Sequence, residues 1–195
     1  MEAQVLSGGF ADPAVQSAQA FRSVMEAMAR PGTIQTITGA QPPAPLSPAA
    51  GSVLLTLCDT DTPVYLSGAA DCDAVRKWLA FHTGAPITGP SHAMFAVGTW
   101  DALAPLSAYQ IGTSAYPDRS ATLIVESDTL DEGATLSGPG IKDTASLSLP
   151  EQAAFQVNRA LFPLGLDFIF TSGDQLAALP RSTVVSAPVG AAEAS

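Results

Sequence analysis

The sequence predicts one α/β domain built around a mixed β-sheet. Segments with helical periodicity alternate with short apolar segments rich in β-branched residues, a pattern typical of helices layered on a sheet. Near the C-terminus, two apolar runs flank Gly173-Asp174 and predict a hairpin, which adds antiparallel pairing. No internal linker divides the 195 residues. We expect an N-terminal arm over residues 1–13, one domain over residues 14–186 and a C-terminal tail over residues 187–195.

The first third of the chain predicts two helices and a strand. In residues 14–30 the apolar positions repeat at three- and four-residue steps: Ala18, Phe21, Met25 and Met28. Pro31-Gly32 ends this helix, because the residue before a proline is pushed out of the helical region. A β-branched stretch over residues 33–38 predicts a strand. After a proline-rich loop, Ser47 is expected to cap a helix that runs to about Cys58.

The middle of the chain alternates between strands and helices. Residues 64–66 predict a short apolar strand, and a helix opens at Asp71 or Asp73 and ends at Gly84. Residues 93–97 and 122–126 predict further strands, separated by a partly helical segment over residues 99–110.

The last third predicts a turn, a helix and the hairpin. Gly138-Pro139-Gly140 is expected to form a tight turn. Ser148 and Glu151 have the spacing of a capping box at the start of a helix over residues 150–162. The hairpin strands are expected over residues 166–171 and 176–179.

Charged residues are scarce. They make up 13% of the chain, about half of the roughly 25% usual for soluble globular proteins. No run of about 18 apolar residues is present, so a membrane span does not explain the deficit. A subunit that buries much of its surface against other proteins would need few charges. A domain with a Ser/Thr/Gly/Ala-rich surface is the alternative.

Charge and cysteine content exclude several classes of function. A net charge of −10 argues against nonspecific binding to nucleic acid and to anionic membranes. Residues 1–10 do not have the pattern of a secretory signal, and the two cysteines, Cys58 and Cys72, form no CxxC pair. Both observations favour the reducing cytoplasm. Two thiols are too few for an iron–sulfur cluster held by this chain alone.

No complete catalytic motif is present. The segment Gly138-Pro139-Gly140-Ile141-Lys142 is rich in glycine but lacks the spacing and the hydroxyl of a phosphate-binding loop. A nucleophile elbow and a dinucleotide-binding motif are also absent. His82 and His92 lie ten residues apart in the sequence, so no metal site is expected.

Five residues stand out as candidates for chemistry. His82, on the apolar side of its helix, could shuttle a proton in a cleft, or it could be a satisfied core or helix-terminal histidine. Asp167 enters an apolar strand and therefore needs a partner, for which an ion pair with an arginine is favoured over catalysis. Arg181, which follows the hairpin, is a candidate anion contact. Arg30 and Arg119 are further candidates, with a solvated surface position as the alternative.

Several short motifs, taken in order, resemble the H-subunit family of bacterial carbon–phosphorus lyase, PhnH. The resemblance spans residues 21–183 and includes Ala27-Met28-Ala29-Arg30-Pro31-Gly32, Phe81-His82-Thr83-Gly84-Ala85-Pro86, Leu136-Ser137-Gly138-Pro139-Gly140-Ile141, Phe162-Pro163-Leu164-Gly165-Leu166-Asp167 and Leu179-Pro180-Arg181-Ser182-Thr183. The resemblance implies a three-layer αβα sandwich like the fold of pyridoxal-phosphate-dependent transferases, usually as a homodimer. It implies no bound pyridoxal phosphate, and Lys77 and Lys142 are poor candidates for its Schiff base.

The resemblance also implies a function. The family works in a multi-subunit complex that transfers ribose triphosphate from ATP to an alkylphosphonate and releases adenine, with the other core subunits as partners. We therefore expect a non-autonomous subunit, in which Arg30, Arg119 and Arg181 would hold anionic oxygens, His82 would move a proton and Asp167 would orient a partner. The competing hypotheses are a stand-alone hydrolase that uses His82 and a purely structural scaffold.

Overall fold

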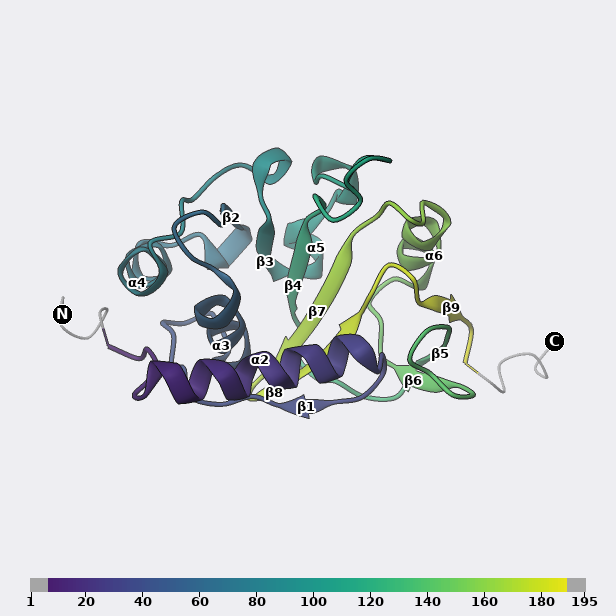
Figure 1. The fold of residues 1–195 in the computed structure, drawn as a ribbon, viewed down its shortest axis with the longest axis horizontal. Helices are drawn as coiled ribbons and strands as arrows, with labels where there is room; N and C mark the ends of the chain where they lie inside the picture. Colours follow the sequence, from purple (N-terminus) through teal and green to yellow (C-terminus); the bar gives the residue numbers. More distant parts are fainter. Residues whose placement is uncertain (1–6, 189–195) are drawn as a thin grey trace.

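The computed structural model describes residues 7–188 and shows a central mixed sheet covered on both faces (Figure 1). The expected arm and tail therefore lie partly outside the described residues, which begin at Ser7 and end at Pro188. The helices are α2 (Pro13–Ala29), α3 (Pro48–Leu57), α4 (Asp73–Thr83), α5 (Trp100–Leu103) and α6 (Gln152–Ala160). Short 3₁₀ turns lie at Gly68–Ala70, Pro90–His92 and Leu106–Ala108. None of the helices in residues 7–188 combines the length and the apolar character needed to cross a membrane.

Six strands form the central sheet, in the order β1 (Gln35–Thr36), β8 (Gln175–Leu179), β7 (Asp167–Ser172), β4 (Thr122–Glu126), β3 (Phe95–Thr99) and β2 (Val64–Leu66). The four strands from β2 to β7 are parallel, whereas β8 pairs antiparallel with β7, and β1 pairs antiparallel with β8. The predicted mixed sheet and the predicted hairpin are confirmed.

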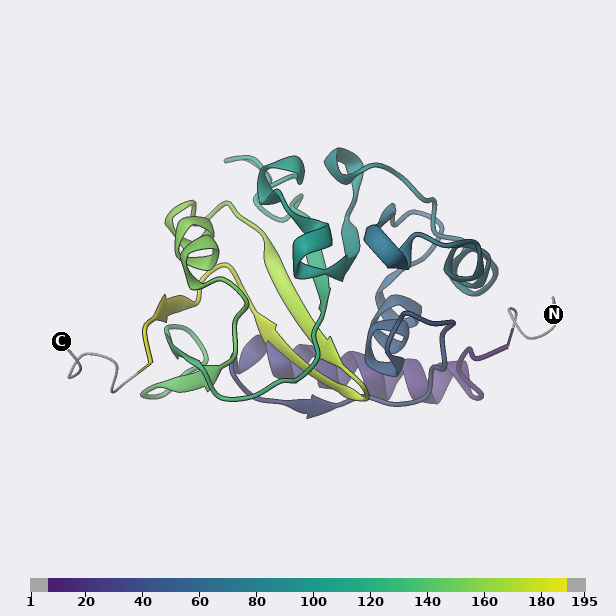
Figure 2. The same cartoon turned by 180° about the vertical axis from the view of Figure 1, so that it is seen from behind.

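The sheet separates two apolar cores. Because side chains alternate between the faces of a strand, Ile124 of β4 points to one core and its neighbours Leu123 and Val125 point to the other. The first core lies under α2, α3 and α4. The second lies under α5, α6 and a small second sheet, seen from behind in Figure 2. One covering layer is thus helical, and the other is part helix and part sheet.

Sequence analysis missed the second sheet. Its order is β6 (Ala145–Leu147), β5 (Ala134–Ser137) and β9 (Val184–Ser186), all antiparallel. Segments of three or four residues are too short to show a period of two, and β9 lies far from the other two strands in the sequence. Only the long-range pairing identifies them.

Several predicted elements are confirmed to within a residue or two, one predicted strand is shorter than expected, and one predicted cap is wrong. Helices α3 and α4 begin and end as expected, with Ser47 Oγ accepting a hydrogen bond from the Ala50 amide (3.1 Å) and Gly84 in the left-handed conformation. The strand predicted over residues 33–38 contains only Gln35–Thr36. The capping box is absent: Glu151 makes no side-chain cap, and Ser148 Oγ instead accepts a hydrogen bond from the Asp131 amide.

Helix α2 has an unexpected orientation. Its large apolar residues Phe21 and Met25 are 47% and 55% exposed, and the face that packs on the core carries Ala20, Val24 and Ala27. An apolar stripe on a helix normally faces the core. Here, small residues allow α2 to lie close against α3 and the sheet, so the larger side chains project into solvent.

The glycine turn fixes the end of α2. Gly140 has φ +81°, and a Cβ at this position would lie 1.9 Å from the Ala29 carbonyl oxygen. The turn that precedes β6 therefore packs its backbone directly against the last residue of α2, which only glycine permits.

Candidate functional site

Asp167 and Arg181 form an ion pair at the start of β7. The hairpin folds β8 back along β7, so the chain leaves β8 beside the residue that opens β7. The Asp167 carboxylate accepts hydrogen bonds from the Arg181 backbone amide (2.8 Å), from Nε (3.2 Å) and from Nη2. The two side chains are only 18% and 13% exposed. Sequence analysis favoured an ion pair for this carboxylate, and the structure contains one.

The other guanidinium nitrogens of Arg181 hold the loop before β4. Nη1 donates to the Pro117 carbonyl (2.7 Å) and Nη2 donates to Ser120 Oγ. Most of the five N–H donors of Arg181 are therefore engaged within the chain. This geometry makes Arg181 a clamp between the hairpin and the loop.

Arg119 and Arg30 lie on the surface. Arg119 belongs to the loop that Arg181 holds, and its guanidinium stacks over the Tyr116 ring, 4.0 Å from the centroid. Arg30 caps the end of α2 and pairs with Glu26 (2.8 Å), and its side chain is 66% exposed. The structure thus brings Asp167 and Arg181 together, with Arg119 in the loop they hold. Arg30 lies at the end of α2 and has no contact with this pair; its side chain pairs with Glu26 instead.

His82 lies under the N-terminal segment. Its ring packs on Trp78 (centroids 5.2 Å apart) and edge-on to Phe81 (4.9 Å). The backbone of Gly9 covers it so closely that a Cβ there would lie 2.4 Å from the ring. The Trp78 indole donates to the Ser7 carbonyl (3.1 Å), which holds the segment in place. Nε2 of His82 is buried without a hydrogen-bond partner among residues 7–188.

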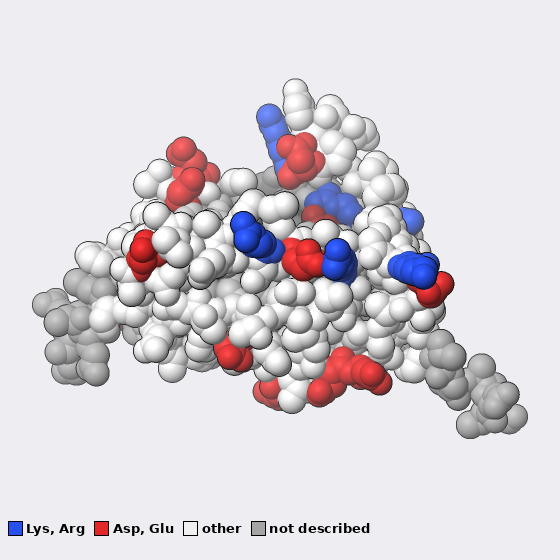
Figure 3. Space-filling model, turned by 60° about the horizontal axis from the view of Figure 1, so that its bottom comes forward, with Lys and Arg blue, Asp and Glu red and all other residues white. Residues whose placement is uncertain are grey.

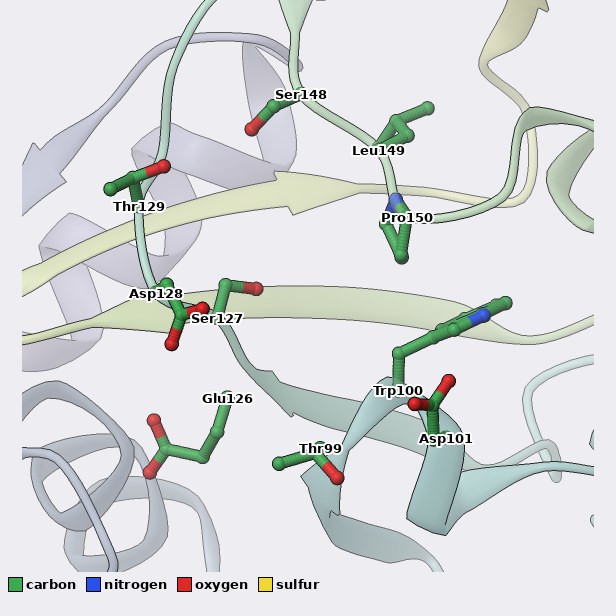
Figure 4. Close-up of a pocket in the computed structure, with 10 residues that line it drawn as sticks. All are labelled: Thr99, Trp100, Asp101, Glu126, Ser127, Asp128, Thr129, Ser148, Leu149 and Pro150. Carbon is green, nitrogen blue, oxygen red and sulfur yellow. The ribbon is translucent and has the colours of Figure 1, made fainter.

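A cavity of about 450 Å³ lies at the carboxyl ends of the parallel strands (Figure 4). In open α/β sheets, ligands commonly bind at this edge. Thr99 ends β3 and Glu126 ends β4, and the two are register partners. Opposite them lie Ser148, Leu149 and Pro150, and the other lining residues are Trp100, Asp101, Ser127, Asp128 and Thr129.

Glu126 is the most constrained group in this cavity. One carboxylate oxygen accepts a hydrogen bond from the Ser47 amide at the start of α3 (2.7 Å), and the other accepts from Thr171 Oγ1 on β7 (3.0 Å). Burial raises the pKa of Glu126 above its ordinary value, while the hydrogen bonds from Ser47 and Thr171 act in the opposite direction. The carboxylate therefore ties β4 to β7 and to the first turn of α3.

Sequence analysis did not single out Glu126. The available signal was its place as the last residue of a buried strand, since the carboxyl edge of an α/β sheet is the usual site of function. Its partners Ser47 and Thr171 are distant in the sequence, so the network itself could not be anticipated.

The cavity is suited to neutral polar or cationic groups. Its lining includes the carboxylates Asp101, Glu126 and Asp128, several hydroxyls and the Trp100 ring, but neither lysine nor arginine. Carboxylates repel phosphate and phosphonate oxygens, so the cavity by itself is a poor anion site. Within residues 7–188, no group of three or more His, Cys, Asp or Glu side chains is arranged to hold a metal ion.

The fold and the cavity define an α/β protein with a mixed sheet and a polar pocket at its carboxyl edge. The chain belongs to the family of bacterial phosphonate metabolism proteins, PhnH: the family model matches residues 8–186. The chain is 44% identical over 194 residues to the Rhizobium meliloti (strain 1021) alpha-D-ribose 1-methylphosphonate 5-triphosphate synthase subunit PhnH, covering 93% of this chain and 96% of that protein. It is also 28% identical over 174 residues to a Stutzerimonas stutzeri protein, HtxG, that carries the name of a C-P lyase subunit, covering 86% and 84% of the two chains.

Proposed function

We propose that this chain is a non-autonomous subunit of a ribose 1-methylphosphonate 5-triphosphate synthase in the carbon–phosphorus lyase pathway. In this role it supports the transfer of ribose triphosphate from ATP to an alkylphosphonate, with release of adenine. The observation that carries the proposal is the 44% identity to a named subunit of that synthase over nearly the full length of both chains. The partners are the other subunits of the complex, in the cytoplasm, and the chain itself is a homodimer.

The placement of the charged groups supports an organising role over independent catalysis. A triphosphate and a phosphonate need several cations, yet the Arg181 guanidinium is engaged by Asp167 and the loop before β4, and Arg30 is paired with Glu26. The carboxyl-edge cavity contributes carboxylates and hydroxyls. In this proposal, other subunits supply most of the anion-binding groups, and Arg119, an exposed residue of the loop before β4, assists them.

The stand-alone hydrolase hypothesis gains no support from the position of His82. Its ring lies beneath Gly9 and does not line the carboxyl-edge cavity. The purely structural scaffold differs from our proposal only in assigning no ligand contact to this chain.

A bound pyridoxal phosphate does not fit the residues present. A Schiff base requires a lysine that is shielded and activated. Both lysines, Lys77 on α4 and Lys142 in the glycine turn, are exposed, and neither lines the carboxyl-edge cavity. We therefore include the transferase-like fold in the proposal without that cofactor, and assign ATP as co-substrate of the complex.

Reconstitution tests the function. A strain that lacks its own PhnH and receives this chain together with the other synthase subunits of the same source should grow with methylphosphonate as the sole phosphorus source. The purified chain alone should release no adenine from ATP and methylphosphonate, and the assembled complex should. If the isolated chain shows turnover, and His82→Ala abolishes it, the stand-alone hydrolase would be correct and this proposal would be wrong.

A further inference from the structure

Helix α2 carries an apolar stripe that faces solvent. The stripe follows steps of four, three, four and three residues through Ala14, Ala18, Phe21, Met25 and Met28. This is the repeat with a period of 3.5 residues by which one helix packs along another. Four of its five members are exposed, and Met28 is partly buried against the core. The neighbouring face of α2 contributes Ala20, Val24 and Ala27 to the core, so burial of this helix depends mainly on those three residues and not on the four exposed members of the stripe.

A hollow beside the stripe extends the surface. It has a volume of about 300 Å³ and is lined by Gln19, Arg22, Ser23, Glu26 and Gln35. Gln35 belongs to β1, the edge strand of the sheet, so the hollow lies between α2 and this edge. Ser23 Oγ donates to the Thr36 carbonyl (3.2 Å), which fixes β1 beside the helix. The surface is therefore formed by elements that are tied to each other.

The charge on the flank of the stripe is cationic. Glu26 is neutralised by Arg30, and no ion pair in the described part of the chain includes Arg22. Figure 3 shows this side of the molecule, where a few Lys and Arg side chains lie across the middle with Asp and Glu between them, more Asp and Glu lie along the lower part, and the rest of the surface carries no charge. An uncharged stripe with one unpaired cation on its flank is complementary to an apolar helix with a carboxylate on its flank.

We propose that the outward face of α2 is the docking surface for an amphipathic helix of another synthase subunit, with acidic residues beside its apolar stripe. The inference rests on the proposed function, because the partner is taken from the same complex. A second copy of this chain fits the surface less well. A twofold axis through the stripe would bring Arg22 close to its own copy, and like charges across an interface oppose association.

Binding measurements on the full-length chain test the surface. The other synthase subunits, co-expressed without this chain and immobilised, are titrated with the purified chain and its variants by biolayer interferometry. Met25→Asp is expected to weaken binding about 30-fold or more, and Phe21→Ala about 10-fold, because both remove apolar contact from the centre of the interface. Arg22→Glu is expected to weaken binding about 10-fold at low salt and less at high salt.

A matched control lies on the other side of the sheet. Val157 of α6 is 68% exposed, so Val157→Asp introduces the same charge on another helix surface and should leave binding unchanged. Thermal unfolding shows whether each variant is folded. If Met25→Asp does not fold, the binding of Phe21→Ala and Arg22→Glu tests the surface.

Each outcome decides the proposal. If all three α2 variants bind as tightly as the unaltered chain, the docking surface on α2 is wrong and the proposed function still holds. If Met25→Asp converts a dimer of this chain to a monomer and leaves binding to the other subunits unchanged, the stripe is an interface with a second copy. That result would also contradict the proposed docking surface. Failure of the unaltered chain to bind would overturn the proposed function together with this surface.

Discussion

Asp167 and Arg181 lie fourteen residues apart in the sequence, and the hairpin between them makes them neighbours. The Asp167 carboxylate accepts hydrogen bonds from both the backbone and the guanidinium of Arg181. Arg181 also holds the Pro117 carbonyl and Ser120, so this one pair connects the hairpin to the loop before β4. The pair thus stabilises the amino-terminal edge of the sheet, at the end opposite the Glu126 cavity.

Removing one member of this pair should destabilise the fold strongly. Asp167→Ala leaves the Arg181 guanidinium largely buried without its counter-charge, which costs about 3 kcal/mol of unfolding free energy. Urea denaturation measures this cost. The matched control is Glu26→Ala, which breaks the exposed pair with Arg30 and should cost less than about 1 kcal/mol. Equal losses from the two substitutions would show that Asp167 and Arg181 do not form a stabilising pair.

Glu126 should make stability depend on pH. Because burial raises its pKa in the folded chain, the fold favours its protonated form. The stabilisation that protonated Glu126 gives to the fold is then fully present below the pKa of this glutamate in the unfolded chain, about 4.3. It is lost as the pH rises through the pKa of Glu126 in the folded chain. Relative to Glu126→Gln, which stays neutral, the unaltered chain should lose unfolding free energy as the pH rises through this range.

Urea denaturation of both proteins over a series of pH values measures this difference. A difference that is constant with pH, or one that changes in the opposite direction, would contradict the raised pKa. Asp131→Asn, a change on an exposed loop outside the cavity, serves as the control for a general effect of removing one negative charge.

Gly140 should tolerate no side chain. Gly140→Ala combines a positive φ with a Cβ 1.9 Å from the Ala29 carbonyl oxygen, so we expect a loss of about 3 kcal/mol or more in unfolding free energy. Gly173 also has a positive φ (+57°), but nothing lies within 4 Å of its added Cβ, and Gly173→Ala should cost about 1 kcal/mol. Thermal or urea unfolding compares the two. Similar losses would show that the close approach to α2 does not matter.

The two cysteines should differ in reactivity. Burial raises the pKa of Cys58 to about 12, so its thiolate is scarce at neutral pH, whereas Cys72 is partly exposed. One thiol should react with a thiol reagent in the native protein, and both should react after unfolding in denaturant. Mass spectrometry identifies the site, and Cys72→Ser should abolish the native reaction. Native labelling of Cys58 would contradict the packing of α3 described here.

The local elements of this fold could largely be read from the sequence. Helix α3 has its Ser47 cap, α4 has its Gly84 stop and the hairpin has its Gly173-Asp174 turn, and each of these signals acts within a few residues. The motifs also identified the family, which the comparisons confirm. The short strands of the second sheet gave no such signal, because three residues show no period.

The candidate site depended on tertiary structure. Sequence analysis anticipated that Asp167 needs a cationic partner, and folding of β8 against β7 decided that the partner is Arg181. It left His82 open between a cleft and a core or helix-terminal position, and packing placed that ring beneath Gly9. The roles suggested for Arg30, Arg119 and Arg181 in anion binding stay predictions.

The sequence by itself determined the helices and the hairpin of this protein, because caps, turns and periodicity depend on neighbouring residues, and its ordered motifs identified the family by resemblance. Only the tertiary structure decided that Glu126 meets Ser47 and Thr171, and that the apolar stripe of α2 faces outward. The physical reason is that pairing between distant strands and the close packing of small residues depend on the whole assembled core, which no local pattern encodes.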